Sequence, residues 1–476
     1  MAEVQQQYQT QTHVTFFVVL CLGAAFLSTV NATLDVLTVI SLMFSVGMAL
    51  VFVLFRGKKI EISAFFYTFS VCVFFGGLAQ TYSLLLFDNL QSTTDAAIYF
   101  YPEIRLIPPF EAPSFDVLFI AYRLAIFIWQ QVYILSWHLG IDGAPYIGVL
   151  FNTLIMAITA SMTVNIARIL YGNDRVRLQK VAILFSLCGI FILFGAVLLR
   201  GCFTTFVNTA VLWAIIKCLC YPKVKNLIIA LVIITIAAVC MISLRFDSLL
   251  LFGAFIGLAL IAWLFQGSFN TVRIMASVVI LVGVASTIGI LSEYSYQIAH
   301  VMELRQDGYA AASSRESAEG SLGMTFIVNQ AWPIRLLIGT LTLIVNPIPF
   351  WAAFNMASFD YHWFMGLFGI YKIVLMPSVI SSSYFIVKGG SNKQAHSTAL
   401  LFLVAYLLVN TFAVVLTSLE QRHIGQFMAA FILIAVFLDN NSIHHRNMYR
   451  SVWFCWFGTV FLIHLLWLIL KLFSFL

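Results

Sequence analysis

The stretch VLTVISLMFSVGMALVFVLF, residues 36–55, decides the fold class because it contains no charged side chain. A helix needs about 20 mostly apolar residues to cross the hydrocarbon core of a bilayer. The run is unbroken, whereas the strands of membrane barrels are shorter and alternate. The sequence therefore predicts an all-α polytopic integral membrane protein of about 13–14 transmembrane helices, in one transmembrane domain over residues 1–476. The other apolar stretches are 14–30, 62–87, 146–167, 181–199, 203–219, 226–243, 248–265, 274–296, 335–352, 363–387, 397–418, 424–438 and 452–475.

The composition leaves no room for a separate soluble domain. Hydrophobic residues make up 62% of the chain and charged residues only 9%, with a mean hydropathy of +0.99. The net charge of +6 is expected to reflect basic cytoplasmic loops rather than a nucleic-acid partner. The eight cysteines lie in or beside apolar segments without metal-ligand or disulfide spacing. No Walker or HExxH motif is present, so neither a metal nor a cofactor is expected.

Basic residues predict the topology. Cytoplasmic loops are expected at 56–59, 168–180 and 217–225. Two loops on one side require an even number of crossings between them, so one of the three apolar stretches between the first two should not span. We predict that 117–137, which contains Arg123 and Gln130, forms a helix at the outer surface within an external region 88–145.

Farther along the chain, residues 297–334 are expected to form a second external loop. Between 335 and 388 the predicted number of membrane crossings is one too many, because this stretch must connect an external loop to a cytoplasmic one. Asn346 and Pro347 lie in this stretch, and proline there is expected to break a helix.

The first external region combines acidic, basic and phenolic side chains just beyond a membrane helix. Such a set suits a site that holds a sugar and activates its hydroxyl group, with Asp95 as the best general base. A solvated loop whose aspartate caps a helix is an equal alternative. The residues are Asp95, Tyr99, Tyr101, Glu103 and Arg105.

Arginines on the predicted outer face form a second group. Guanidinium groups match phosphate oxygens in a bidentate fork, and external arginines run against the positive-inside tendency. A lipid-linked diphosphate would account for them, and anchoring to lipid headgroups is the alternative for each one. They are Arg105, Arg200, Arg245, Arg305, Arg315, Arg335 and Arg422.

The last polar group is the connection 420–423 between two apolar helices, with Glu420 expected to bind substrate. His423 beside Arg422 could exchange a proton or steady a leaving phosphate, and a hydrated turn is the alternative. Lys372 is the clearest charge expected to lie unpaired within the membrane, where an ion-coupled transporter would carry several.

Together these features resemble the polytopic glycosyltransferases and oligosaccharide repeat-unit (O-antigen or capsule) polymerases of bacterial surface polysaccharides. The resemblance lies in Asp95 with its two tyrosines, the surface helix, the helix from Asn152 to Arg168, the external Arg200, and the late pair of Arg422 and His423. It departs from the GT-C glycosyltransferases, whose paired acidic motif is represented only by Asp95 and Glu103.

The resemblance implies a metal-independent polymerase in the bacterial inner membrane, working on the periplasmic face. Its substrate would be an undecaprenyl-diphosphate-linked oligosaccharide, and a chain-length regulator is the expected protein partner. By this resemblance the base is Asp95 or His423, and the phosphate ligands are Arg200, Arg305 and Arg422. The alternatives are a GT-C transferase that uses a polyprenyl-phosphate sugar and a flippase for lipid-linked oligosaccharides. Polar residues confined to the outer rim favour an enzyme over a flippase.

Overall fold

The computed structural model describes residues 2–88, 90, 123–141, 144–245, 257, 259, 330–347, 350–354, 361–389, 394–417, 421–438 and 443–474. Every described element is a helix. The chain divides into two compact units. Unit one comprises Met1–Ala214, Ala230–Phe246 and Pro349–Tyr371, and unit two comprises Ile215–Ile229, Asp247–Ile348 and Lys372–Leu476.

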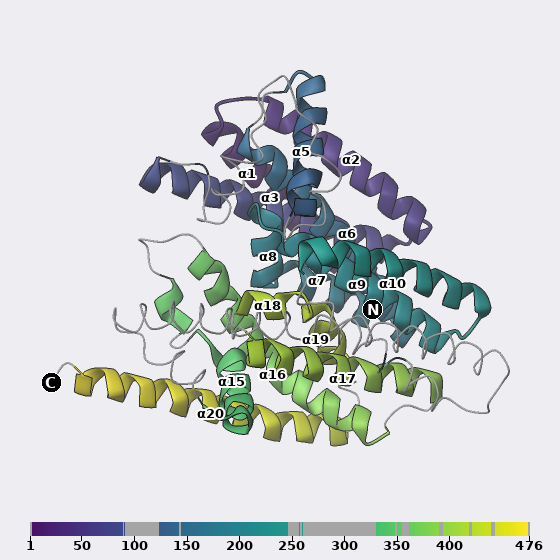
Figure 1. Ribbon diagram of the computed structural model, residues 1–476, viewed down its shortest axis with the longest axis vertical. Coiled ribbons are helices and arrows are strands. Elements are labelled where there is room, and N and C mark those ends of the chain that lie inside the picture. Colours follow the sequence, from purple (N-terminus) through teal and green to yellow (C-terminus); the bar gives the residue numbers. More distant parts are fainter. Residues whose placement is uncertain are drawn as a thin grey trace, which may run out of the picture. The chain divides into compact units, whose positions relative to one another are not determined.

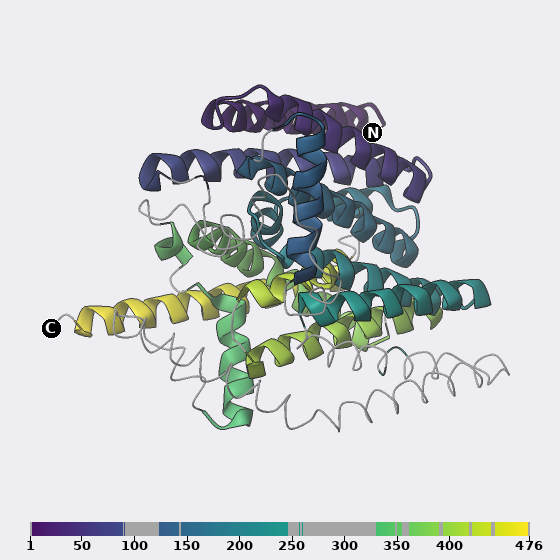
Figure 2. The ribbon, with the colours of Figure 1, turned by 45° about the horizontal axis from the view of Figure 1, so that its top comes forward.

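Unit one is built around α3 and α6, which are long and largely buried. α1 and α2 pack on α3, and α6 packs against α2, α3, α7 and α8 (Figures 1 and 2). Most of α9 and α10 belongs to this unit. Residues Ile215–Ile229, which include the turn between the two helices, belong to unit two. The helices are α1 (Ala2–Val30), α2 (Asp35–Phe55), α3 (Lys59–Phe87), α5 (Arg123–His138), α6 (Pro145–Tyr171), α7 (Arg175–Ser186), α8 (Gly189–Ala196), α9 (Gly201–Cys220) and α10 (Val224–Leu244).

The contact between α1 and α3 depends on glycine. A Cβ atom at Gly23 would lie 2.5 Å from backbone atoms of Phe74, and one at Gly77 would lie 2.8 Å from the carbonyl oxygen of Gly23. Small residues let two membrane helices approach closely, and packing then replaces the hydrophobic effect that lipid does not provide. α1 is therefore held on α3 by direct backbone contact.

The stretch predicted as one helix at 181–199 is broken. α7 ends at Ser186, α8 begins at Gly189, and the two axes differ by 57°. All eight residues of α8 are buried. The break is possible because protein surrounds it, since backbone groups freed by a kink must find partners inside the protein rather than in lipid.

Unit two contains three long helices and several short ones. α15 is Trp332–Val345, α16 is Tyr361–Val387, α17 is Gln394–Thr417, α18 is Gln421–Gly425, α19 is Met428–Ala435 and α20 is Ile443–Ser474. The first part of α16, up to Tyr371, and the 3₁₀ turn Phe350–Ala353 belong to unit one. α17 packs against α15, α18 and α19.

Two predicted helices of unit two need correction. The stretch 335–352 is not one helix: α15 ends at Val345, immediately before Asn346 and Pro347, as the proline predicts. The stretch 424–438 is not a crossing helix either. α19 has 8 residues, which extend for about 12 Å, and all of them are buried. An apolar sequence buried in protein cannot be told from a lipid-facing one by hydropathy alone.

The chain is an all-α polytopic membrane protein. Nine described helices are long and apolar enough to span a bilayer, or up to ten if the bent pair α7–α8 counts as one span. The predicted helices 248–265 and 274–296 lie outside the described residues, apart from 257 and 259. The single transmembrane domain and the two external loops stay predictions.

Candidate functional site

The structure describes five of the predicted site residues. Arg200 and Arg245 belong to unit one, and Arg335, Arg422 and His423 belong to unit two. The others lie outside the described residues: Asp95, Tyr99, Tyr101, Glu103, Arg105, Arg305, Arg315 and Glu420. Each unit therefore contributes its own set of groups.

In unit one, α5 links the ends of several helices at the predicted outer side. α5 runs across the direction of α1 and α3 (Figure 2). The hydroxyl oxygen of Tyr133 lies 3.1 Å from the carbonyl oxygen of Ala144 and accepts a hydrogen bond from the Gly148 backbone N–H at 3.2 Å, so α5 is fastened to the beginning of α6. Burial raises the pKa of the Tyr133 hydroxyl well above its ordinary value, which keeps this group neutral.

Asn152 fastens α5 to the segment that carries Arg200. The Asn152 side chain accepts a hydrogen bond from the Trp129 indole at 2.9 Å. It donates to the carbonyl oxygens of Val197 and Leu199 at 2.9 and 3.2 Å. These carbonyls belong to the non-helical link between α8 and α9, and Arg200 follows directly in a turn where it is half-buried.

The other end of α5 meets α10. The backbone N–H of Leu124 donates to the hydroxyl oxygen of Ser243 at 2.9 Å. Arg123, which begins α5, and Arg245, which follows α10, are each within two residues of this bond. Three half-buried arginines thus lie beside the attachments of α5: Arg123, Arg200 and Arg245. We call this set the α5 arginines.

In unit two, the late polar turn is buried. Gln421 and His423 are 5% and 8% exposed, and Arg422 between them is half-buried. The Gln421 side-chain oxygen lies 3.4 Å from the Lys372 ammonium group, near the middle of α16. The alternative of a hydrated turn is therefore wrong for Gln421 and His423, whereas the proposed role of His423 in a site stays a prediction. α19, which follows this turn, is buried along its whole length.

The Lys372 ammonium group is hydrogen-bonded to neutral oxygen atoms within the protein. Besides Gln421, its ammonium group donates to the carbonyl oxygens of Leu343 and of Asn346, the second at 3.0 Å. Arg335, which is 7% exposed near the start of α15, donates from Nε to the carbonyl oxygen of Val415 at 3.1 Å. Buried basic groups from α15 and α16 therefore belong to the same unit as the pair of Arg422 and His423.

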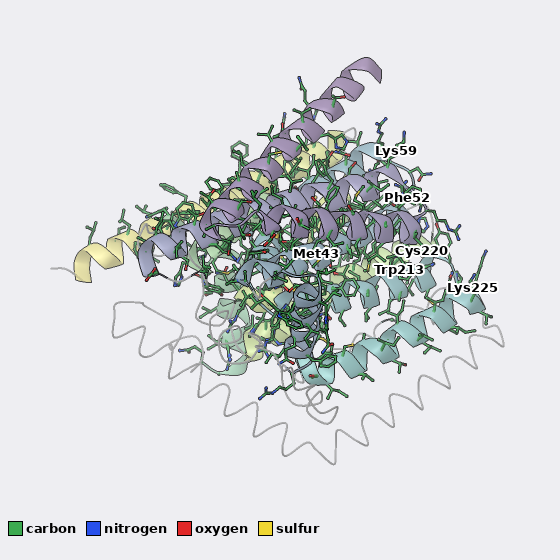
Figure 3. All side chains as sticks on the ribbon, turned by 90° about the horizontal axis from the view of Figure 1, so that it is seen from above. Met43, Phe52, Lys59, Trp213, Cys220 and Lys225 are labelled. Carbon is green, nitrogen blue, oxygen red and sulfur yellow. The ribbon has the colours of Figure 1, made fainter. Side chains whose placement is uncertain are left out.

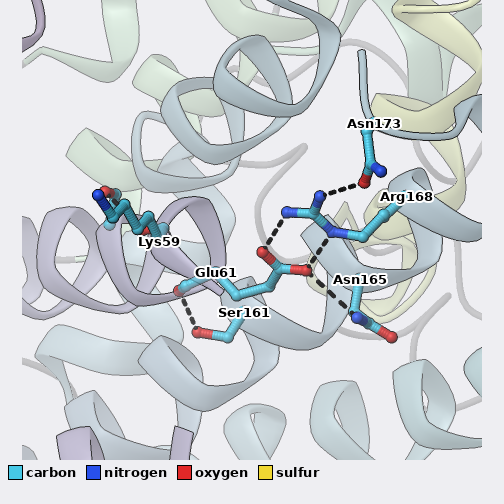
Figure 4. Close-up of polar contacts among 7 residues, drawn as sticks. Lys59, Glu61, Ser161, Asn165, Arg168 and Asn173 are labelled. Atoms are coloured by element: carbon cyan, nitrogen blue, oxygen red, sulfur yellow. Dashed lines mark hydrogen bonds and ion pairs between the residues drawn. The ribbon is translucent and has the colours of Figure 1, made fainter. Parts of the chain in front are cut away.

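A separate polar network lies at the predicted cytoplasmic end of unit one (Figure 4). Glu61, fully buried near the start of α3, receives a bidentate pair from Arg168 on α6, with N–O distances of 2.7 and 2.6 Å. Asn165 donates to the same carboxylate at 3.2 Å, and Ser161 donates to the Glu61 carbonyl oxygen at 2.8 Å. Arg168 also donates to Asn173 at 2.7 Å, so the network closes the turn after α6.

Among the described residues, no group of three or more His, Cys, Asp or Glu side chains is arranged to hold a metal ion. The chain matches no protein-family model, no curated protein and no solved structure. The function must therefore be inferred from the residues themselves.

Sequence reasoning missed four anchoring residues: Glu61, Trp129, Asn152 and Gln421 as the partner of Lys372. Two signals could have found some of them. An acidic residue two positions inside a long apolar helix, as at Glu61, needs a buried partner. An asparagine inside an apolar run, as at Asn152, needs hydrogen-bond partners within the protein.

Proposed function

We propose that this chain is a bacterial inner-membrane glycosyltransferase that joins undecaprenyl-diphosphate-linked oligosaccharide units on the periplasmic face. In the reaction, the hydroxyl group of the acceptor sugar attacks the anomeric carbon of the donor. A glycosidic bond forms, the bond to the diphosphate breaks, and a base accepts the hydroxyl proton. The product chain grows by one unit and undecaprenyl diphosphate leaves.

The observation that carries the proposal is the set of α5 arginines. Arg123, Arg200 and Arg245 lie at helix ends joined by one helix that runs across the spans. The sequence predicts α5 at the outer membrane surface, and the diphosphate of a membrane lipid lies at such a surface, between the acyl region and water. Arginine stays charged at any relevant pH and binds phosphate oxygens in pairs. The α5 arginines are therefore the groups that we expect to hold the diphosphate in unit one.

The pair of Arg422 and His423 supports the same proposal from unit two. Both residues lie on the short helix α18, between α17 and the buried α19. A histidine can accept or donate a proton near neutral pH, and the neighbouring arginine can stabilise negative charge on a leaving phosphate. His423 and Asp95 remain the two bases to be compared.

The test is complementation of a deletion strain, with surface glycan examined as a gel ladder. We expect wild type to restore long chains. Arg422→Ala and Arg200→Ala should leave a single capped repeat unit, because loss of a phosphate ligand lowers turnover by about 100-fold or more. Arg175→Ala is the matched control, since Arg175 is exposed at the start of α7 on the predicted cytoplasmic side.

The other outcomes separate the alternatives. A ladder of unchanged length with altered sugar content in the deletion strain would indicate a GT-C transferase that adds single sugars. Loss of all surface glycan, with lipid-linked units retained on the cytoplasmic side, would indicate a flippase. Either result would overturn the polymerase proposal, and equal ladders from Arg175→Ala and Arg422→Ala would remove Arg422 from the site.

A further inference from the structure

Lys372 lies where three separate pieces of unit two meet. It belongs to α16, it donates to the carbonyl oxygens of Leu343 and Asn346 at the end of α15, and it donates to the side chain of Gln421 at the start of α18. The side chain is 2% exposed. Its described partners come from segments 26, 29 and 49 residues away in the sequence.

The chemistry of these bonds assigns a role. An ammonium group has three hydrogens to donate, and these three acceptors are enough to occupy all of them. Two of the acceptors are carbonyl oxygens at the end of α15, where the helix presents unsatisfied carbonyls and a partial negative charge. Lys372 is therefore occupied as a cap for α15, which leaves it no hydrogen for a substrate.

The third bond connects this cap to the turn that carries Arg422 and His423. Gln421 directly precedes Arg422, and the Gln421 side chain is buried. This bond is long, at 3.4 Å, but both groups are buried, and a bond from a charged donor is stronger than a neutral bond of the same geometry. The position of α18 then depends on the position of the end of α15.

We propose that Lys372 is a positioning residue: it links the end of α15 to Gln421 and thereby sets where Arg422 and His423 lie. The link itself is independent of the reaction, whereas its effect on chain joining rests on the proposed function. The oxygen atoms of Asn346 and Gln421 accept the hydrogen bonds that complete the link.

The first measurement does not depend on activity. Hydrogen–deuterium exchange of the purified full-length protein in nanodiscs is followed for peptides covering 338–347 and 421–427. In Lys372→Met, exchange in both peptides should rise by about tenfold or more, because two helix ends lose hydrogen bonds to a charged donor. Lys372→Arg should keep exchange close to wild type. Lys388→Met is the control, because Lys388 is exposed near the end of the same helix.

The second measurement uses the glycan ladder. Lys372→Met should lose the long chains although the protein is still inserted and folded, Lys372→Arg should restore them, and Lys388→Met should leave them unchanged. In Gln421→Leu, exchange should rise in 421–427 but not in 338–347, since the α15 cap remains.

Exchange in Lys372→Met that rises equally along the whole chain, or in neither peptide, would overturn the proposal. If exchange changes as expected while the ladder identifies a transporter, the link stands and the proposed function fails. If long chains persist in Lys372→Met despite the expected exchange, Lys372 has no positioning role in the reaction.

Discussion

At the scale of single residues, the buried pair of Glu61 and Arg168 has the clearest consequence for stability. A charge left alone inside a protein costs far more than an exposed one, and breaking a buried pair typically costs about 3–5 kcal/mol. We expect Arg168→Ala to lower the apparent Tm of the detergent-solubilised protein strongly.

Arg177→Ala is the matched control. The Nε atom of Arg177 lies 3.3 Å from a carboxylate oxygen of Asp174, and the two side chains are 24% and 38% exposed. An exposed pair of this kind contributes about 1 kcal/mol or less. The double variant Glu61→Met with Arg168→Met should recover much of the loss, because it leaves no unpaired charge. Equal losses of Tm from Arg168→Ala and Arg177→Ala would contradict the prediction.

Single residues of the candidate site differ in how well the sequence predicts them. The arginines were found because a charge is conspicuous in an apolar chain. Their partners were not, because Asn152 is bonded to Trp129 and to carbonyls more than 40 residues away, and contacts of that range are decided by packing. The hydrogen bonds of Lys372 were not predictable for the same reason.

At the scale of elements, the approach of α1 to α3 can be tested with one methyl group. In Gly23→Ala the new Cβ atom would meet backbone atoms of Phe74 at 2.5 Å, so the helices must move apart. Overpacking of this kind costs about 1–3 kcal/mol. We expect a lower apparent Tm in detergent and faster exchange in α1.

Gly458→Ala on α20 provides the control, since a Cβ atom there has no described neighbour within 4 Å. Alanine favours a helix more than glycine does, so this variant should be neutral or slightly stabilising. A Tm for Gly23→Ala at or above that of wild type would show that α1 does not pack on α3 through its backbone.

The length of a helix was predictable where the thickness of the bilayer sets it or where a turn residue ends the helix. α2 occupies Asp35–Phe55, one residue longer than the apolar stretch, and its end is followed by Arg56 and Gly57 with positive φ. The Phe52 ring lies against Gly57 of this turn, and Lys59, which begins α3, is labelled near Phe52 in Figure 3. The breaks at α7–α8 and α18–α19 were not predictable, because an apolar run looks the same whether lipid or protein surrounds it.

At the scale of the whole molecule, the ion pair between Glu61 and Arg168 indicates which loops lie on the same side of the membrane. Since Glu61 lies in the first turn of α3 and Arg168 in the last turn of α6, the loops at 56–59 and 168–180 lie at the same end of unit one. Both loops are basic, so we expect both in the cytoplasm. Leu139, which is 54% exposed just after α5, should lie on the opposite side of the membrane.

Cysteine labelling measures this directly, in a background that carries Cys21→Ser and Cys455→Ser to remove the exposed thiols. A membrane-impermeant maleimide should label Leu139→Cys in spheroplasts. It should label Lys58→Cys and Arg175→Cys only after the inner membrane is opened. Labelling of Lys58→Cys and Arg175→Cys from different sides would refute the shared end.

The short helix α19 has a consequence for biosynthesis. A translocon recognises segments long enough to enter the bilayer by themselves, and 8 apolar residues fall well below the roughly 20 that this requires. α19 cannot be threaded into the membrane as an independent unit when it leaves the ribosome. We expect it to fold only after α17 has been inserted, because α17 is a helix on which it packs. The turn that carries Arg422 and His423 is therefore among the last parts of the protein to mature.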